Sequence, residues 1–398
     1  MKMGFKFILA ALLPLAAAAA QQSAAELNRI AGTPLFGDVE LWKEAPSAVV
    51  WRLNLNCRAE KSGTGRMYSS PVSRSVFGCR ATEIRIFAGE KTVSRVDVIL
   101  VNKGDVIGAK RKTGIKSELR RSRDDLEKLL RENFGRPRRV AFGEGALKRQ
   151  LNMWTCGDHA LVVDYADGEY LIIRIVPPES LSGSKRGGEV KVEERKSFAA
   201  NVRRESNGDV FIDGVPMVDQ GRKGYCVPAT VERLLRYYGI AGVDMHNLAE
   251  KYKTGVGGGT QGSRMVRGSR RIFGDCGLKM REAGAMRRHT IVRNVDRGIP
   301  VLWFHYSGGK FQERLNFSLA SRKRATPEGW KGVLASQKRI RRNTEGAHVA
   351  LLIGYNRDTD EFAISNSWGD RYRIAWVRYA DMEQADMGVQ LYVVLPHK

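Results

Sequence analysis

A glycine-rich turn that leads into a cysteine and then into an amphipathic helix constrains this chain most strongly. The stretch GRKGYCVPAT covers residues 221–230 and continues as VERLLRYYG. Apolar and aromatic residues at i, i+3, i+4 and i+7 from Val231 follow the helical period, and Gly239 supplies a stop. Cys226 therefore stands at a helix start, where the helix dipole favours a thiolate. Its position alone leaves three roles open: half of a disulfide, a buried thiol or a nucleophile.

The residues before the cysteine suit a catalytic loop. Gly221 and Gly224 allow the backbone to turn tightly and to approach a substrate closely. Gln220 lies six residues before Cys226 and could present its side-chain amide to a developing oxyanion.

A nucleophilic cysteine needs a base and a group that orients the base. One of the six histidines, His348, begins an apolar, strand-like run in GAHVALLIGYN, residues 346–356. A short turn, NRDTD, and a second strand, EFAISN, follow it. If the two strands pair about residue 357, His348 and Asn366 become cross-strand neighbours with side chains on one face. The asparagine oxygen would then accept from one ring nitrogen and leave the other to face Cys226.

Three blocks of this sequence resemble the signatures of papain-like cysteine peptidases. They are Q-G-x-x-G-x-C at 220–226, G-A-H-V-A-x-x-x-G-Y at 346–355 and N-S-W-G at 366–369. The VPAT continuation is more similar to the bacterial branch that includes the bacteriocin-leader peptidases. The resemblance implies an α+β fold in which the cysteine-bearing helix packs on an antiparallel sheet, with no metal or organic cofactor. It also implies the following roles: Gln220 in the oxyanion hole, Cys226 as nucleophile, His348 as base, Asn366 as its orienter, Trp368 as the shield of the Asn–His contact, and Gly224 and Tyr225 as substrate-contacting or supporting residues.

The chain departs from the plant and lysosomal enzymes of this superfamily at two places. Pro228 and Ala229 replace the usual aromatic pair, and a long basic segment precedes His348. These departures concern the substrate class, which they leave undetermined, more than they concern the expected triad. We expect a peptidase that hydrolyses peptide or isopeptide bonds. The same residues could instead serve a transpeptidase or acyltransferase, or a catalytically inactive cell-surface binding protein.

The N-terminal half is expected to form a separate α+β module of unknown role over residues 21–178. Strand-like runs occur at 49–55, 81–88 and 93–102, and a capped amphipathic helix is predicted over 122–135. A hairpin is predicted from GDHALVVDY and EYLIIRIV on either side of an ADG turn. Polar residues 179–207 indicate a linker, so the peptidase domain would cover 208–398.

The first twenty residues have the pattern of a secretory signal peptide. Lys2 and Lys6 precede the apolar run FILAALLPLAAAAA, which ends in small residues. We expect cleavage near Ala20 and an extracytoplasmic protein, periplasmic or secreted, with no transmembrane segment in the mature chain.

The chain has five cysteines, and an oxidising compartment outside the cytosol would allow them to form disulfides. Cys57 and Cys79, between strand-like runs of the first module, are the expected disulfide if any forms. Cys156 and His159 have a ligand-like spacing, but two ligands do not make a zinc site. No metal site is therefore predicted.

The chain carries a formal net charge of +24. A peptide or protein substrate that is acidic or linked to an anionic glycan would suit this charge. Residues 322–342, which are strongly basic, could supply the contact if they border the cleft. Nucleic acid is an unlikely partner because no RNA- or DNA-binding motif is present. No oligomeric state is indicated.

Overall fold

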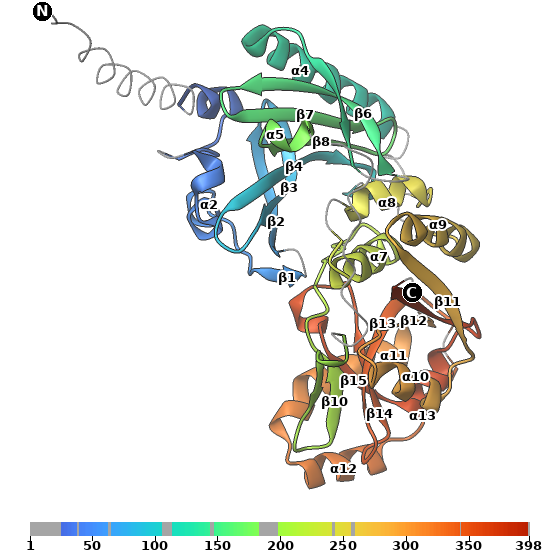
Figure 1. Ribbon diagram of the computed structural model, residues 1–398. Coiled ribbons are helices and arrows are strands. Elements are labelled where there is room, and N and C mark those ends of the chain that lie inside the picture. The colour runs from blue at the N-terminus through green and yellow to red at the C-terminus, as the bar shows by residue number, and fades with distance from the viewer. Residues whose placement is uncertain are drawn as a thin grey trace, which may run out of the picture. The chain divides into compact units, whose positions relative to one another are not determined.

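The computed structural model describes residues 25–37, 40–62, 65–105, 114–143, 147–182, 198–240, 243–255, 259–342 and 344–396. They belong to two compact units (Figure 1), one built mainly from the chain up to residue 182 and one mainly from residue 198 onward. The expected signal peptide, residues 1–20, lies outside the described residues. Within the described ranges, no helix is both long and apolar enough to cross a membrane.

The first unit is built on an eight-stranded sheet. Its strands are β1 (Glu60–Ser62), β2 (Gly65–Val76), β3 (Cys79–Ala88), β4 (Val93–Asn102), β5 (Arg138–Phe142), β6 (Arg149–Cys156), β7 (His159–Ala166) and β8 (Tyr170–Val176). The order across the sheet is β1-β2-β3-β4-β8-β7-β6-β5. Two antiparallel meanders thus meet where β4 pairs with β8. The predicted strands at 81–88 and 93–102 and the predicted hairpin are confirmed.

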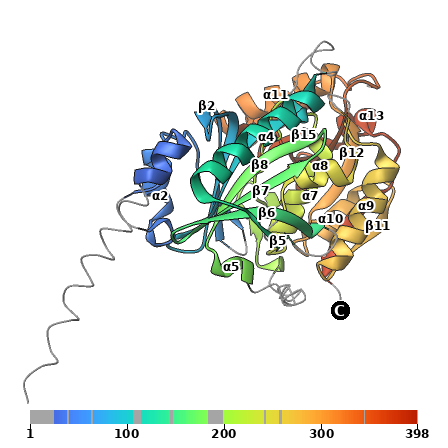
Figure 2. The same ribbon diagram turned by 90° about the horizontal axis from the view of Figure 1, so that it is seen from above.

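One long helix covers a face of this sheet. Helix α4 (Ile115–Phe134) connects β4 to β5 and contacts β4, β6 and β8, as Figure 2 shows. Its apolar side buries Leu119, Leu126 and Leu130. The helix predicted over 122–135 is therefore confirmed, although it begins seven residues earlier. Short helices η1 (Leu41–Lys43), η2 (Lys103–Asp105) and α5 (Glu179–Ser182) complete the unit.

The strand predicted over residues 49–55 is wrong. Helix α2 (Pro46–Arg52) occupies most of that segment, with Pro46 in the first turn, where its missing N–H costs nothing. Val49 and Leu53, four residues apart, are both fully buried, which is a helical spacing. The β-branched run was therefore read with the wrong period.

The expected Cys57–Cys79 disulfide is absent from the structure, in which all five cysteines are free thiols. The Cys79 sulfur instead lies 3.6 Å from the carbonyl oxygen of Ser122 in α4. Burial, together with the charge of nearby Asp125, raises the pKa of the Cys79 thiol to about 11. A buried, protonated thiol of this kind packs as a small apolar group.

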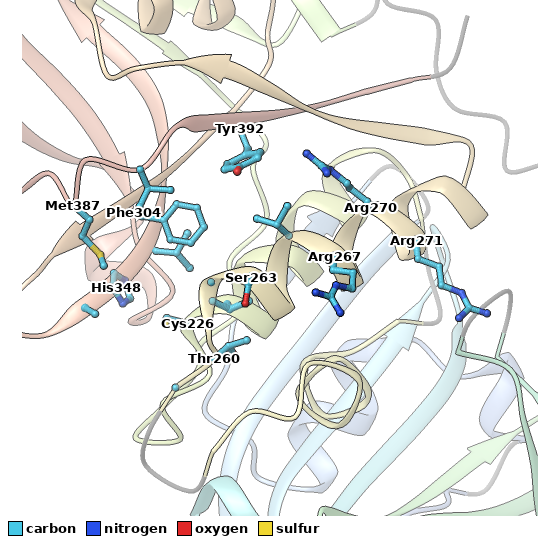
Figure 3. A pocket seen from close by; sticks show the side chains of 17 residues that line it. Cys226, Thr260, Ser263, Arg267, Arg270, Arg271, Phe304, His348, Met387 and Tyr392 are labelled. Atoms are coloured by element: carbon cyan, nitrogen blue, oxygen red, sulfur yellow. The ribbon is translucent and has the colours of Figure 1, made fainter.

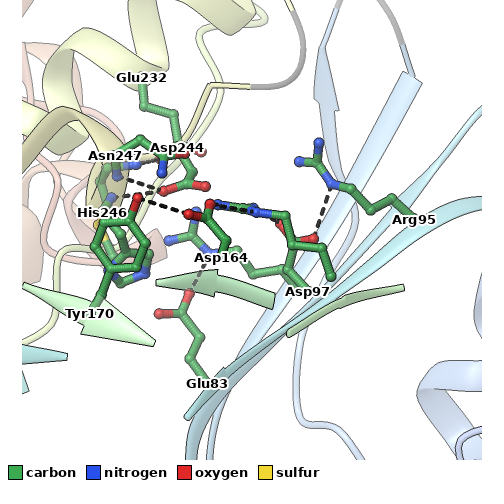
Figure 4. A network of polar contacts seen from close by, with 12 residues as sticks. Glu83, Arg95, Asp97, Asp164, Tyr170, Glu232, Asp244, His246 and Asn247 are labelled. Carbon is green, nitrogen blue, oxygen red and sulfur yellow. Dashed lines mark hydrogen bonds and ion pairs between the residues drawn. The ribbon is translucent and has the colours of Figure 1, made fainter. Parts of the chain in front are cut away.

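The sheet of the first unit also carries a buried charge network (Figure 4). Arg174 is fully buried; its guanidinium donates to Asp97 at 2.6 Å and to Asp164 at 2.8 Å. Tyr170 donates to the same Asp164 at 3.2 Å. Two carboxylates around one guanidinium satisfy donors that burial would otherwise leave costly.

The second unit also contains an antiparallel sheet of eight strands. Its strands are β9 (Val202–Arg204), β10 (Asp209–Ile212), β11 (Leu278–Gly284), β12 (Val301–Tyr306), β13 (Ala347–Asn356), β14 (Glu361–Ser365), β15 (Ala375–Arg378) and β16 (Leu391–Pro396). The main path runs β11-β16-β12-β13-β10-β9, and β14 pairs with both β13 and β15. β13 is therefore the central strand.

Helices surround this sheet. They are α7 (Cys226–Tyr237), α8 (Met245–Lys251), α9 (Gly262–Asp275), α10 (Arg288–Val295), α11 (Gly309–Ser321), α12 (Pro327–Ser336) and α13 (Tyr379–Ala385), with η4 (Arg322–Arg324) and η5 (Asp370–Tyr372). All twelve residues of α7 are buried, and it packs on β13 (Figure 1). The expected cysteine-bearing helix on an antiparallel sheet is thus confirmed.

Helix α8 is fastened to α7 by polar groups. Asp244 caps α8 by accepting from the backbone N–H groups of His246 and Asn247. Glu232 of α7 accepts from the N–H of Met245 at 2.7 Å. Two carboxylates therefore satisfy three otherwise orphaned N–H groups at this helix start.

The β13–β14 hairpin contains a bulge. Leu352 pairs with Ile364, but the next pair is Gly354 with Ala363, so Ile353 has no counterpart in β14. One extra residue changes the face on which every later side chain of a strand lies. The hairpin predicted with a simple register therefore has the right turn and strands but a shifted pairing.

Part of the segment expected as a linker is structured. Residues 183–197 lie outside the described residues, but Glu179–Ser182 form α5 and Val202–Arg204 form β9, which pairs with β10. Phe198 is already part of the core of the second unit. That unit thus begins no later than Phe198 rather than at residue 208.

Gly354 tests how tightly the central strand is packed. A Cβ atom there would lie 2.7 Å from the Val210 oxygen, 2.8 Å from Phe211 Cβ and 2.9 Å from Ala363 Cβ. We expect Gly354→Ala to lower the free energy of unfolding by about 1–3 kcal/mol, as overpacking does. Urea denaturation measures this loss.

The matched control is Gly332→Ala in the interior of α12, where no atom lies within 4 Å of a new Cβ. It should be neutral or stabilising by up to about 1 kcal/mol, because alanine favours helices. Equal stabilities for the two variants would show that β10 and β14 do not constrain Gly354.

Candidate active site

The loop before Cys226 needs two glycines. Gly221 has a φ of 56° and Gly224 a φ of 69°, both in the left-handed region. The N–H of Gly221 donates to Asp219 Oδ1 at 2.8 Å, which closes the turn. Side chains at these two positions would strain the backbone, so the loop sequence follows from its geometry.

Cys226 is the first residue of α7, as predicted. Tyr225 occupies the N-cap position without a side-chain cap, so the first N–H groups of the helix remain available near the sulfur. Burial raises the pKa of the Cys226 thiol, while the backbone N–H groups of Val349, Val227 and Cys226 lower it in part. The thiol therefore rests in its neutral form in this structure.

His348 and Asn366 meet as the sequence predicted, although they are not direct cross-strand partners. His348 Nε2 lies 3.0 Å from Asn366 Oδ1. Since an amide oxygen only accepts, Nε2 carries the hydrogen and the lone pair is on Nδ1. β14 ends at Ser365, and the Asn366 N–H donates to the oxygen of Tyr372 at 3.0 Å. The asparagine is thus held just beyond the strand.

Burial controls the charge of His348. Burial, helped by the positive charge of Arg233, lowers the imidazole pKa to about 3, although the hydrogen bond to Asn366 acts in the opposite direction. Trp368 covers the ring, with centroids 4.3 Å apart and planes at 33°. The expected shielding role of Trp368 agrees with this geometry.

Ser367, which the sequence did not single out, fixes Gln220. Its hydroxyl donates to Gln220 Oε1 at 2.7 Å, and its carbonyl accepts from the Gln220 N–H at 2.9 Å. Because the amide oxygen is engaged, the orientation of the side chain is set and its NH2 group is the remaining donor. Ser367 lies inside the N-S-W-G block, so its position was visible although its role was not.

Arg233 links two elements that carry candidate catalytic groups. It is fully buried and lies two turns after Cys226 on α7. Its guanidinium donates to the carbonyl oxygens of Pro216 at 2.7 Å and Ser365 at 3.0 Å. The helix with the cysteine is thereby fastened to the strand end beside Asn366. Sequence reasoning missed this residue because an arginine on an amphipathic helix is usually solvated.

A second buried histidine lies beside the first. His305 of β12 is the cross-strand partner of His348, and their ring centroids are 5.3 Å apart. It stacks on Trp303 at 4.1 Å, and burial holds its pKa well below the usual value. His305 is therefore neutral, so it adds no positive charge beside His348.

Cys226 and His348 line one pocket of about 850 Å³. Figure 3 shows them at one end of it, with Phe304 and Met387 nearby, while Arg267, Arg270 and Arg271 of α9 lie toward the other end. Asp219, Gly221 and Trp368 line a smaller, separate pocket of about 490 Å³. The reactive pair therefore has access to a cavity large enough for several side chains.

Tyr225 and the segment 322–342 were both expected to contribute to the site, but neither lines the large pocket. Tyr225 is buried and contacts His246 edge to face, so it supports the loop rather than lining the large pocket. No described residue of 322–342 lines that pocket. Arg322 in that segment instead pairs with Asp209 at 2.7 Å and Glu361 at 3.0 Å. The proposed contact of this segment with the cleft is therefore not found.

The candidate zinc ligand His159 is also structural. It is buried against Phe36 and Trp42, and burial lowers its pKa. Among the residues that the structure describes, no group of three or more His, Cys, Asp or Glu side chains could hold a metal ion.

A family model and a solved structure are similar to part of this chain. The Peptidase_C39 like family matches residues 212–386. No curated protein matches the sequence. Xylellain, a cysteine protease from Xylella fastidiosa, shares 14% sequence identity over 51% of this chain and 90% of its own, with a TM-score of only 0.26. Residues 212–386 therefore form a domain that is similar to the Peptidase_C39 like family.

Proposed function

We propose that this protein is a cysteine peptidase that hydrolyses peptide or isopeptide bonds with Cys226, His348 and Asn366. The contact of His348 Nε2 with Asn366 Oδ1 at 3.0 Å carries the proposal. This contact engages Nε2, so the basic nitrogen Nδ1 faces away from the asparagine. The imidazole lines the same pocket as the Cys226 thiol. A purely structural histidine would have no reason to share a cavity with a cysteine at a helix start.

The charges of the pair define the first step. The raised pKa of Cys226 and the lowered pKa of His348 both favour neutral groups. His348 Nδ1 therefore acts as a general base: it takes the thiol proton while Sγ attacks the substrate carbonyl carbon. Asn366 keeps the ring in place and stabilises the imidazolium that forms.

The oxyanion is stabilised by two donors. The Gln220 NH2 group and the Cys226 backbone N–H are the candidates, and Ser367 sets the orientation of the amide in advance. A donor that needs no reorientation costs nothing at the moment of reaction. Collapse of the tetrahedral intermediate breaks the C–N bond, and the imidazolium protonates the leaving amine.

Deacylation repeats the chemistry with water. His348 removes a proton from water, whose oxygen attacks the thioester; the thiolate leaves and regains the proton. An amine in place of water would give transpeptidation through the same residues. Neither pathway requires a metal or an organic cofactor.

The proposed roles predict graded losses of activity. Cys226→Ala should abolish turnover of a fluorogenic peptide library and labelling by iodoacetamide at this position. Gln220→Ala should lower kcat by about 10²–10³-fold, as loss of an oxyanion donor does. Ser367→Ala should give a smaller loss that appears in kcat rather than in KM, since it acts through the orientation of Gln220.

Cys276→Ala is the control, because Cys276 is a partly exposed thiol outside the pocket. It should keep wild-type turnover. Full activity of Cys226→Ala would refute the proposed function, and an inert wild-type protein in reduced, folded form would favour a binding protein instead.

The neutral histidine also predicts how stability depends on pH. Below about pH 6.5 the unfolded chain binds a proton at residue 348, whereas the folded protein binds it only near pH 3. The free energy of unfolding should therefore fall as the pH falls from about 6.5 toward 3. His305 contributes in the same direction.

Urea denaturation at pH 7.5 and 5 measures this effect. His348→Gln should lose less stability between the two pH values than the wild type does, whereas His289→Gln, at an exposed position, should behave as the wild type. An unchanged pH dependence for His348→Gln would show that the imidazole is not held neutral by burial.

We also propose an extracytoplasmic location. The basic residues Lys2 and Lys6 before an apolar run and the small residues near Ala20 support it. Expression with the native N-terminus should yield a mature protein outside the cytoplasm that starts near Gln21, as determined by intact mass. An uncleaved, cytoplasmic product would exclude this location.

A further inference from the structure

One wall of the large pocket carries a row of arginines on helix α9. Arg267, Arg270 and Arg271 are related by i, i+3 and i+4 spacing, so they share a side of the helix. The opposite side of α9 buries Met265, Ile272 and Phe273 and anchors it. The helix therefore presents positive charge to the cavity from a fixed support.

Two of these charges have no internal partner. Arg270 forms an ion pair with Glu282 at 3.2 Å on the surface. Arg267 and Arg271 have no ion pair or hydrogen bond with any residue that the structure describes. No aspartate or glutamate is among the described residues that line the pocket. Like charges at this spacing destabilise a helix slightly, so the row costs stability in the free protein.

The wall nearer the reactive pair is apolar. Phe304 and Met387 lie there near His348 (Figure 3), and Val266, Val389 and Tyr392 also line the cavity. An occupant that fits both walls carries apolar side chains and carboxylates. A polypeptide with both kinds of residue has this chemistry, whereas a sulfated glycan would leave the apolar wall unmatched.

Resting on the proposed peptidase function, we infer that the pocket selects peptide segments with an apolar residue near the scissile bond and acidic residues farther along. From Ser263 to Arg271 the helix rises about 12 Å at ~1.5 Å per residue. An extended peptide advances about 3.3 Å per residue, so the acidic residues fall about two to four positions from the bond that is cut.

Carboxylates are among the groups that unpaired arginines bind well. The guanidinium can donate two parallel hydrogen bonds to one carboxylate, a geometry that lysine cannot reproduce. Contacts on a partly open wall are screened by salt, so the preference should weaken as the ionic strength rises.

The first experiment compares quenched peptides that differ only at the second to fourth positions from the scissile bond, with glutamate, glutamine or lysine there. The wild type should cleave the glutamate peptides with kcat/KM at least about 10-fold above that for the lysine peptides. The double variant Arg267→Glu/Arg271→Glu should reverse this order, so that the lysine peptides have the higher kcat/KM.

The charge-matched control is Arg264→Glu/Arg293→Glu. Both arginines are exposed, outside the pocket and without partners among the residues described, and Arg264 lies on α9 itself. The control has the same net charge as the test variant but should keep the wild-type preference. A control that loses the preference would assign it to the overall charge rather than to the pocket.

A binding measurement separates this inference from the proposed function. Fluorescein-labelled glutamate and lysine peptides are titrated into Cys226→Ala, with and without the Arg267→Glu/Arg271→Glu pair, and anisotropy is followed. Tighter binding of the glutamate peptide, lost with the arginines, supports the pocket even if no peptide is cleaved. Cleavage without any charge preference overturns the inference and leaves the peptidase function intact. Heparin or single-stranded DNA that binds as tightly as the glutamate peptide would also overturn the assignment to a peptide.

Discussion

The site depends on one irregularity in the central strand. In the β13–β14 hairpin the pairing shifts by one residue at the Ile353 bulge. Gly354 pairs with Ala363 on the turn side, whereas Leu352 pairs with Ile364 on the other side. Side chains alternate between faces along a strand, so this one-residue shift in register moves His348 to the other face relative to Asn366. With the register of the turn continued, the two side chains would lie on opposite faces. The bulge therefore brings them to one side, and the 3.0 Å contact follows.

The elements around this contact are fastened by buried polar groups rather than by apolar packing alone. Arg233 joins the cysteine helix to the end of β14, and Ser367 joins the end of β14 to Gln220. A buried group without a partner costs about 1–3 kcal/mol, so such bonds penalise alternative placements of the helix. One short segment, residues 365–368, thereby sets the positions of the imidazole, the oxyanion donor and the thiol-bearing helix together.

Part of this arrangement could be predicted from the sequence. Residue types and spacing predicted Cys226, His348, Asn366 and Gln220 because their chemistry requires those groups and because glycine and turn residues mark the loops. The bulge was not predicted, although VALLIGYN contains Gly354, and a glycine inside a strand often marks a bulge. Arg233 and the arginines of α9 were overlooked for one reason: their role depends on what they face, and a helical pattern gives the side of a helix but not its neighbour.

The misread strand at 49–55 has a related cause. β-branched residues favour strands only where a pleated, half-buried surface is available, and tertiary packing overrides that preference. Val49 and Leu53 are buried at a helical spacing, so the core of the first unit selected the helix.

The unpaired arginines of α9 lie at a distance from Cys226 and His348, and this separation has a physical reason. His348 and His305 are held neutral by burial, and the thiol is neutral as well. An acidic side chain bound directly beside the cysteine would stabilise its protonated form further and oppose attack. Placing the unpaired arginines toward the far end of the cavity lets a substrate carboxylate be recognised at a distance from the sulfur. Coulomb interactions weaken with distance and with solvent access, so that end can select for charge with little effect on the proposed proton transfer from Cys226 to His348.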